Sequence, residues 1–147
     1  MNRKIKFRIW DKVKKIYLLN HNFNSIVKCH LVNEDDFERY IYQQFTGLKD
    51  KNGQEIYEGD ILLSLIDNYS SLVKYGYYRQ FEELNLPDGR IHTFNYSHVG
   101  FFVECKIDGE EFEGTLAITN SNSIVIGNIF QNPELCESKV DKLPPNH

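Results

Sequence analysis

Apolar and polar residues alternate along most of this chain, and clusters of turn residues separate the alternating segments. Residues 4–9 show the pattern most clearly, and their period of two is typical of a strand with one buried and one solvated face. The apolar positions are Ile5, Phe7 and Ile9, and the basic positions are Lys4, Lys6 and Arg8. Asp11-Lys12 then predicts a turn into a second strand over residues 16–19, which gives a hairpin with its basic face outside.

The centre of the chain carries the strongest turn signals. We predict a strand from Tyr40 to Phe45, a tight bend at Thr46-Gly47 and a hairpin turn at Asn52-Gly53, where both residues tolerate positive φ. An acidic corner at Glu58-Gly59-Asp60 then leads into a buried strand over residues 61–66. Before the strand that starts at Tyr40, residues 34–40 could instead form a short helix capped by Asn33.

Turn signals recur in the second half of the chain. Asp108-Gly109 predicts a hairpin between strands over residues 99–107 and 111–118, and residues 124–130 supply a last strand. Asn132-Pro133-Glu134 predicts a final helical turn, because asparagine caps helices and proline suits the first helical position. Residues 68–98 contain aromatic residues among turn residues without a clean period. They predict a long excursion from the sheet that packs on itself or against a neighbouring subunit.

These elements together predict a mainly β protein. The expected fold is a small β-barrel or roll, with an SH3-like barrel as one form of it, built from hairpins and one or two short helices. A chain of 147 residues is the size of one domain. We expect that domain to span residues 1–140 and residues 141–147 to form a frayed tail.

Composition adds compartment and redox state to this picture. The chain is 41% hydrophobic and 26% charged, which is typical of a globular protein and too apolar for a disordered one. No apolar run approaches the roughly 18 residues of a membrane span, and no signal peptide follows the basic start, so we expect a cytoplasmic protein. The cysteines, odd in number and widely spaced, predict reduced thiols. They are Cys29, Cys105 and Cys136.

Charge is distributed unevenly along the chain. Residues 1–15 hold seven of the 17 basic side chains and one acidic side chain, so the remaining residues carry ten basic and 20 acidic ones. One interpretation is the solvated face of the first strand. The alternative is a nucleic-acid-binding surface in which basic side chains attract phosphates and aromatic ones stack on bases, although the acidic remainder opposes it. Its candidate residues are Arg3, Lys4, Lys6 and Arg8.

Among catalytic patterns, Pro87-Asp88 followed by Glu104-Cys105-Lys106 matches the spacing of a metal-dependent nuclease motif. In that chemistry Asp88 and Glu104 would hold a divalent metal, and Lys106 would orient the attacking water. The competing interpretation is structural, because Pro87-Asp88-Gly89 is a turn sequence, whereas a metal site requires a rigid element.

Two further groups of residues suggest metals. The first, around the central hairpin, could bind a hard cation or simply solvate the turns. It comprises Asp50, Glu55, Glu58 and Asp60. The second has zinc-ligand chemistry but no recognised spacing. It comprises His21, His30, His92, His98 and Cys29. The chain also lacks a phosphate-binding loop, a dinucleotide fingerprint and a nucleophile elbow, so we expect neither a metal nor a cofactor.

Three motifs, at the start, the centre and the end of the chain, carry a resemblance to a known family. They are Lys6–Asp11, Thr46–Ile61 and Ile126–Ile129, the last with Asn132–Leu135. Together they resemble the YopX family of small phage and prophage proteins. That resemblance implies a β-rich accessory protein of the bacterial cytoplasm without an assigned catalytic residue.

The residues of these motifs have structural explanations. We expect Trp10 in the core, Asp60 as a cap on its corner, Gly127 at a close backbone approach and the remaining motif residues in turns. The turn residues are Gly47, Asn52, Gly53 and Gly59.

Function is then expected on the surface. The hypothesis is a noncatalytic protein-interaction or assembly module that forms a homo-oligomer and binds an unidentified phage or host protein. Nucleic-acid binding is the alternative, followed by a metal-dependent nuclease.

Overall fold

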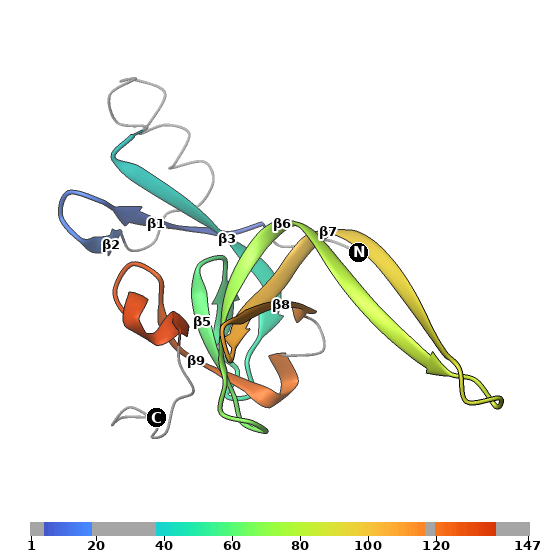
Figure 1. Cartoon of the computed structure of the whole chain (residues 1–147). Helices are drawn as coiled ribbons and strands as arrows, with labels where there is room; N and C mark the ends of the chain where they lie inside the picture. The colour runs from blue at the N-terminus through green and yellow to red at the C-terminus, as the bar shows by residue number, and fades with distance from the viewer. Residues whose placement is uncertain (1–4, 19–37, 117–119, 138–147) are drawn as a thin grey trace.

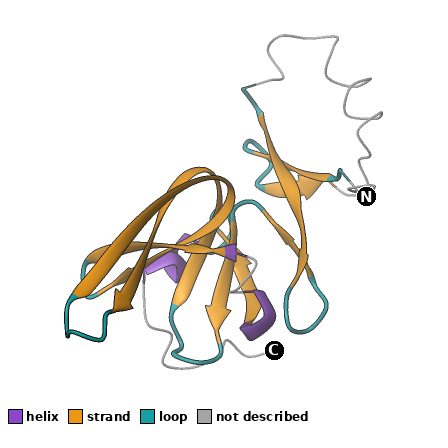
Figure 2. Cartoon of the chain, turned by 90° about the vertical axis from the view of Figure 1, so that its right-hand side faces the viewer, coloured by secondary structure: helices purple, strands orange, loops and turns teal. Residues whose placement is uncertain are grey.

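The computed structural model describes residues 5–18, 38–116 and 120–137, and within them nine strands form two antiparallel sheets (Figure 1). The first sheet has the order β2-β1-β3-β4, from β1 (Phe7–Asp11), β2 (Ile16–Leu18), β3 (Tyr40–Lys49) and β4 (Glu55–Tyr57). The second has the order β8-β7-β6-β5-β9, from β5 (Asp60–Ser64), β6 (Ser70–Asn85), β7 (Ile91–Ile107), β8 (Glu110–Thr115) and β9 (Ser123–Asn128). It curls into a half-barrel beside the first sheet (Figure 2). Two short 3-10 helices, η2 (Asn120–Asn122) and η3 (Pro133–Glu137), flank β9. The prediction of a mainly β fold is confirmed.

β1 and β2 form the predicted hairpin, with Trp10 opposite Tyr17. The predicted assignment of faces on β1 is confirmed for Ile9, which is buried, but wrong for Ile5 and for the basic side chains. Ile5 is 59% exposed, whereas Ile9 and Trp10, neighbours on opposite faces of the strand, are both buried. The face that carries Arg8 and Trp10 therefore lies inside the protein, and Lys6 and Arg8 are only partly exposed.

β3 is longer than predicted. It continues through Thr46-Gly47 as far as Lys49, and its pairing with β4 shifts register between Phe45 and Lys49. Gly47, at φ +90°, therefore serves a β-bulge within a strand rather than a bend that ends it. Residues 34–37 of the alternative helix lie outside the described part, and Tyr40 already belongs to the strand.

The turn between β3 and β4 differs from the prediction in detail. The Gly53 N–H donates to the Asp50 carbonyl at 3.0 Å, and Gly53 has φ +84°. Asn52 is not among the residues with positive φ, so the turn places one residue, not two, in the left-handed region. The Asp50 carboxylate stabilises this turn by accepting from the N–H groups of Asn52 and Gln54, each at 2.9 Å.

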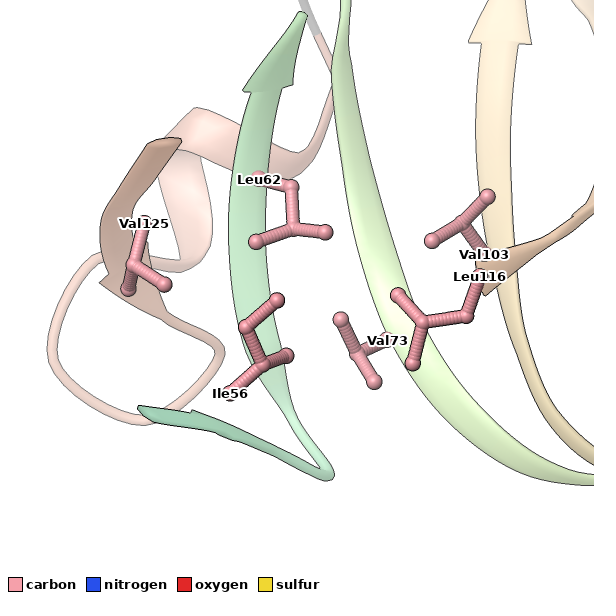
Figure 3. Packing of buried hydrophobic residues seen from close by; sticks show 6 residues of the cluster. All are labelled: Ile56, Leu62, Val73, Val103, Leu116 and Val125. Atoms are coloured by element: carbon pink, nitrogen blue, oxygen red, sulfur yellow. The ribbon is translucent and has the colours of Figure 1, made fainter. Parts of the chain in front are cut away.

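The half-barrel sheet has a hydrophobic cluster on each face, and β5 contributes to both. Leu62 points into one cluster (Figure 3), and Ile61 and Leu63 into the other. The first cluster comprises Ile56, Leu62, Val73, Val103, Leu116 and Val125. The second comprises Ile61, Leu63, Ile124 and Ile126, with Leu72, Leu135 and Cys136 packed against it. The predicted buried strand is confirmed, although it ends at Ser64.

In the second half, Asp108-Gly109 forms the predicted hairpin turn between β7 and β8, with φ of 51° and 88°. β9 and η3 match the predicted last strand and helical turn. The predicted excursion over residues 68–98 is instead most of a long β-hairpin made by β6 and β7. The predicted tail lies outside the described residues.

Candidate interaction surface

The β6–β7 hairpin extends well beyond the sheet that it belongs to. β5 pairs with β6 only at Ser70–Leu72, and β8 pairs with β7 only at Phe102–Ile107. Beyond these positions β6 and β7 pair with each other alone, and residues 77–99 form a two-stranded β-arm that projects to the right in Figure 1. Nine paired residues per strand span roughly 30 Å.

A pair of glycines lies at the base of the β-arm. Gly76 faces Gly100 across the two strands, and Gly76 has φ +156°. Two neighbouring pairs on one face are separated by about 7 Å in a regular ribbon. The cross-strand pairs that contain Tyr78 and Phe102 are two such steps apart, about 14 Å, yet the ring centroids of these residues are only 5.1 Å apart. The ribbon thus bends toward this face where no side chains intervene.

The bend is held by contacts with the edge strand β8. The Arg79 N–H donates to Glu113 Oε2 at 2.8 Å, and the Thr115 hydroxyl donates to Gln80 Oε1 at 3.0 Å. Tyr78 is buried there against Phe102. One face of the β-arm is thus partly covered near its base by the chain itself.

That face, named here the His98 face, carries a ladder of aromatic rings. Ring centroids lie 5.2 Å apart for Tyr78 and His98, 6.3 Å for Tyr96 and Phe94, and 4.6 Å for Phe94 and His92. Cross-strand pairing also places Leu84 on this face, opposite His92. Away from the base the ladder is exposed.

The opposite face, named here the Phe81 face, is open along its whole length. Tyr77 is 57%, Phe81 64% and Val99 72% exposed. Its cross-strand pairs are Tyr77 with Val99, Arg79 with Ser97, Phe81 with Asn95, Glu83 with Thr93, and Asn85 with Ile91. Tyr75 and Phe101 continue the same face toward the half-barrel.

The tip of the β-arm is a tight turn. The Leu86 N–H donates to the Arg90 carbonyl at 2.8 Å, and Gly89 adopts φ +84°. Asp88 pairs with Arg90 at 2.6 Å, and this guanidinium lowers the pKa of the Asp88 carboxyl. The whole β-arm holds Arg79 and Arg90 against three acidic residues, so its net charge is close to zero.

The nuclease candidates do not converge. Asp88 is at the tip of the β-arm, whereas Glu104 is at the base of β7, roughly 40 Å away along the strand. Glu104 forms an ion pair with Lys74 at 2.6 Å. Lys106 lies two residues further along the same strand. No single metal ion can contact both carboxylates in this arrangement.

The candidate basic residues are engaged with carboxylates of the same chain. Lys6 forms an ion pair with Glu55. Arg8 reaches from β1 to Asp60 on β5, with 2.6 Å between Nη2 and Oδ1, and its Nε donates to Gln43 Oε1 at 2.7 Å. The Arg8 guanidinium also lies over two tyrosine rings. Arg3 and Lys4 lie outside the described residues.

The two tyrosines around Arg8 complete a polar cluster that joins the sheets. Tyr17 and Tyr57 place their ring centroids 4.7 and 5.0 Å from the guanidinium carbon. Burial raises the pKa of each tyrosine to about 12. Both phenols therefore stay protonated at neutral pH, as donors to Gln43 Oε1 at 2.7 Å and Glu55 Oε2 at 2.9 Å respectively. Burial also raises the pKa of Asp60, and the Arg8 charge opposes that effect.

Of the remaining metal candidates, Asp50 and Asp60 accept hydrogen bonds from backbone N–H groups. Asp50 Oδ2 accepts from the Val125 N–H at 2.9 Å, which ties the central turn to β9, and Asp60 Oδ2 accepts from the Tyr57 N–H at 2.8 Å, as predicted for a cap. Burial raises the pKa of Glu58. No group of three potential metal ligands occurs within residues 5–18, 38–116 and 120–137.

The histidine and cysteine candidates also lie apart. His92 and His98 are six residues apart on the β-arm, roughly 20 Å, which is too far to share a zinc ion. Cys105 and Cys136 are free thiols, and burial raises the pKa of Cys105, so its reactive thiolate is disfavoured. His21, His30 and Cys29 lie outside the described residues.

The motif residues occupy the strand and turn positions that hold the two sheets together. Trp10 stacks on Phe130 with ring centroids 5.5 Å apart. Gly59 has φ +80°, and a Cβ atom there would lie 2.0 Å from Gln43 Nε2. A Cβ atom on Gly127 would lie 2.6 Å from Asn132 Oδ1, so the close neighbour of Gly127 is a side chain rather than backbone.

Comparison with known proteins agrees with these motifs. A family model described as YopX protein matches residues 6–137. The chain belongs to the YopX family. This YopX-family protein is also similar to protein EF1440 from Enterococcus faecalis, a solved structure with 24% sequence identity and a TM-score of 0.45. The match covers 92% of this chain and 100% of that one. No curated protein matches this chain.

Helices of membrane-spanning length and hydropathy are absent from the part of this YopX-family protein that the structure describes.

The sequence interpretation missed that residues 68–98 form a β-hairpin, although one signal for it existed. The Pro87-Asp88-Gly89 turn was recognised, and Gly76 and Gly100 lie at equal distances on either side of Asp88. Equal flanking segments around a strong turn predict a hairpin. The expected alternation was hidden because both faces of the β-arm carry aromatic residues.

One prediction concerns the acid stability of the first sheet. Asp11 is buried at the β1–β2 turn, where Arg39 donates to it at 2.6 and 3.1 Å and the Val13 and Lys14 N–H groups also donate to it. The Arg39 hydrogen bonds are the main cause of a lowered Asp11 pKa. A carboxyl whose pKa is lower in the folded state stabilises the fold above its unfolded pKa near 3.8, and that stabilisation is lost as the pH falls below it.

We therefore expect the Asp11→Asn variant to lose less stability than wild type between pH 5 and pH 2, as measured by urea denaturation at each pH. Glu82→Gln on the exposed β-arm is the matched control and should follow wild type. Parallel curves for wild type and Asp11→Asn would contradict the assignment.

Proposed function

We propose that this YopX-family protein is a noncatalytic protein-interaction or assembly module of phage or prophage origin, that it acts in the bacterial cytoplasm, and that the β-arm is its binding element. One observation carries the proposal: residues 77–99 form a two-stranded ribbon with large apolar side chains exposed on both faces. An isolated hairpin is at best marginally stable in water. Large contiguous apolar surfaces mark interaction sites.

The charge of the β-arm favours a protein partner over a nucleic acid. Its two arginines are outnumbered by acids, and Arg90 is already paired with Asp88. Stacking of bases on aromatic residues would require a positive groove to hold the phosphates. At the start of the chain, Lys6 and Arg8 are held by Glu55 and Asp60.

The test is affinity capture of the tagged protein from phage-infected cells that also express a second, differently tagged copy. Nuclease-treated and untreated lysates are compared by mass spectrometry. The arm variant carries Tyr77→Ser, Phe81→Ser and Val99→Ser. A matched control replaces three exposed apolar residues elsewhere, with Val13→Ser, Ile16→Ser and Ile66→Ser.

We expect a captured protein, either the second copy or another chain, that survives nuclease treatment, is retained by the control variant and is reduced at least tenfold with the arm variant. Circular dichroism should show that both variants are folded. Recovery that disappears with nuclease would favour nucleic-acid binding. Recovery that is equal for the arm and control variants would contradict the role of the β-arm.

A further inference from the structure

The Phe81 face of the β-arm carries groups of matching or opposite chemistry at several positions placed equally on either side of its centre. The centre is the pair Phe81 and Asn95, which lie opposite each other on the two strands. Two residues away along β6, Arg79 lies on one side and Glu83 on the other. A positive and a negative charge thus lie at equal distances from the centre.

The second strand of the β-arm repeats this symmetry. Ser97 and Thr93 lie two residues to either side of Asn95, and Val99 and Ile91 lie four residues to either side. Ser97 thus has a second hydroxyl residue, Thr93, at the equivalent position, and Val99 has a second β-branched apolar residue, Ile91. A rotation that exchanges the two ends of the face would superpose groups of like or complementary chemistry at these positions, while Tyr77 would exchange with Asn85.

We propose that two copies of this chain associate by packing their Phe81 faces together in antiparallel directions around a two-fold axis at Phe81. The inference rests on the proposed function, because it names a second copy as the protein that the β-arm binds. A two-fold interface must be self-complementary, since each copy presents the same surface. Here Arg79 of each copy faces Glu83 of the other, Ile91 faces Val99, and Phe81 faces Phe81.

The size of the surface fits a dimer. On the Phe81 face and its continuation, five large apolar residues are between 54% and 72% exposed. They are Tyr75, Tyr77, Phe81, Ile91 and Val99. At about 200 Å² for each fully exposed side chain, they present roughly 600 Å² per copy. Complete coverage of these residues in two copies would bury at most about 1,200 Å², at the lower end of the range for specific interfaces.

The geometry also selects the Phe81 face over the His98 face. Tyr78 on the His98 face is buried against Phe102, and Gln80 accepts a hydrogen bond from Thr115 of β8. A second ribbon could not lie flat along that face as far as the base. On the Phe81 face Tyr77, Arg79, Ser97 and Val99 are all exposed, so these side chains near the base are accessible to a facing ribbon.

Sedimentation equilibrium of the purified full chain tests the association. Wild type should be a dimer, and Phe81→Glu should be monomeric because it places two like charges together at the axis. Arg79→Glu and Glu83→Arg should each weaken the dimer about tenfold, since each single reversal replaces two attractive contacts with two repulsive ones. Combining Arg79→Glu with Glu83→Arg should restore wild-type affinity. Glu82→Arg, on the His98 face, is the control and should have no effect.

Cross-linking tests the register. Packed sheets lie about 10 Å apart, so a short bismaleimide can join facing positions. Phe81→Cys should cross-link with itself. Ile91→Cys and Val99→Cys should not cross-link alone, because equivalent residues then lie roughly 26 Å apart along the strands, but a mixture of the two should. Wild type gives the background from its native cysteines.

A wild-type protein that stays monomeric at every concentration would overturn the dimer, while arm-dependent capture of another protein would leave the proposed function standing. A dimer that tolerates Phe81→Glu, or one with a different cross-linking pattern, would also overturn the inference. Failure of the proposed function gives a different result, namely equal protein capture by the arm variant and the control variant.

Discussion

The Arg8→Ala variant should unfold with a free energy about 3–5 kcal/mol lower than that of wild type, because removing one partner of a buried ion pair leaves the other charge without compensation. Asp60 is 1% exposed, and its Oδ1 lies 2.6 Å from Arg8 Nη2. The variant also removes the donor to Gln43 Oε1 and the cation between the rings of Tyr17 and Tyr57. The measurement is urea denaturation followed by the fluorescence of Trp10, which packs in the same sheet.

Two control variants separate the lost charge from lost packing. Lys6→Ala removes a more exposed ion pair, with Glu55, and should cost less than about 1 kcal/mol. Combining Arg8→Met with Asp60→Asn removes both charges and should recover most of the lost stability, since the new amide side chain retains an oxygen for the Tyr57 N–H. Equal losses of unfolding free energy for Arg8→Ala and Lys6→Ala would show that the charge of Asp60 does not need compensation by Arg8.

The second large effect is expected for Gly59→Ala, at about 2–4 kcal/mol of unfolding free energy. Gly59 has φ +80°, and the new Cβ atom would lie 2.0 Å from Gln43 Nε2. Gln43 cannot move away freely, because its Oε1 accepts from Arg8 and Tyr17 at 2.7 Å. The Gly59 backbone is also held, since its N–H donates to the Val73 carbonyl and its carbonyl accepts from the Ile129 N–H.

Gly53→Ala is the matched control for this variant. Gly53 has nearly the same φ, +84°, but nothing lies within 4 Å of the position of its Cβ atom. Its cost should therefore be the backbone term alone, about 1–2 kcal/mol. Thermal or urea denaturation of both variants gives the difference. If Gly59→Ala cost no more than Gly53→Ala, the contact with Gln43 would not constrain this corner.

Much of the fold could be predicted from short-range signals. Asp108-Gly109, Asp11-Lys12 and the apolar run after Asp60 gave the correct hairpins and buried strand, because turn conformation and side-chain alternation depend on neighbouring residues. The same signals failed at Gly47, because a bulge and a bend both require a glycine at positive φ. Only the pairing with β4 distinguishes them.

The ion pair between the sheets could not be predicted in the same way. Arg8 and Asp60 are far apart in sequence, and Arg8 belongs to an alternating strand whose basic side chains were expected to face water. Alternation shows that two faces differ, but it does not show which of them another sheet will cover. The nearby Gln43, Tyr17 and Tyr57 acquire their roles only when β1, β3 and β5 come together.

The sequence by itself determined the β class, several turns and the family, because these depend on local backbone preferences and on short motifs. Only the tertiary structure decided that Asp88 and Glu104 lie far apart, that Arg8 is paired and that residues 77–99 leave the sheet as a β-arm. Each of these is a relation between residues distant in the chain, set by which strands pair and which faces remain uncovered. Local patterns do not encode those relations, since the same alternation of side chains suits either a buried or an exposed ribbon.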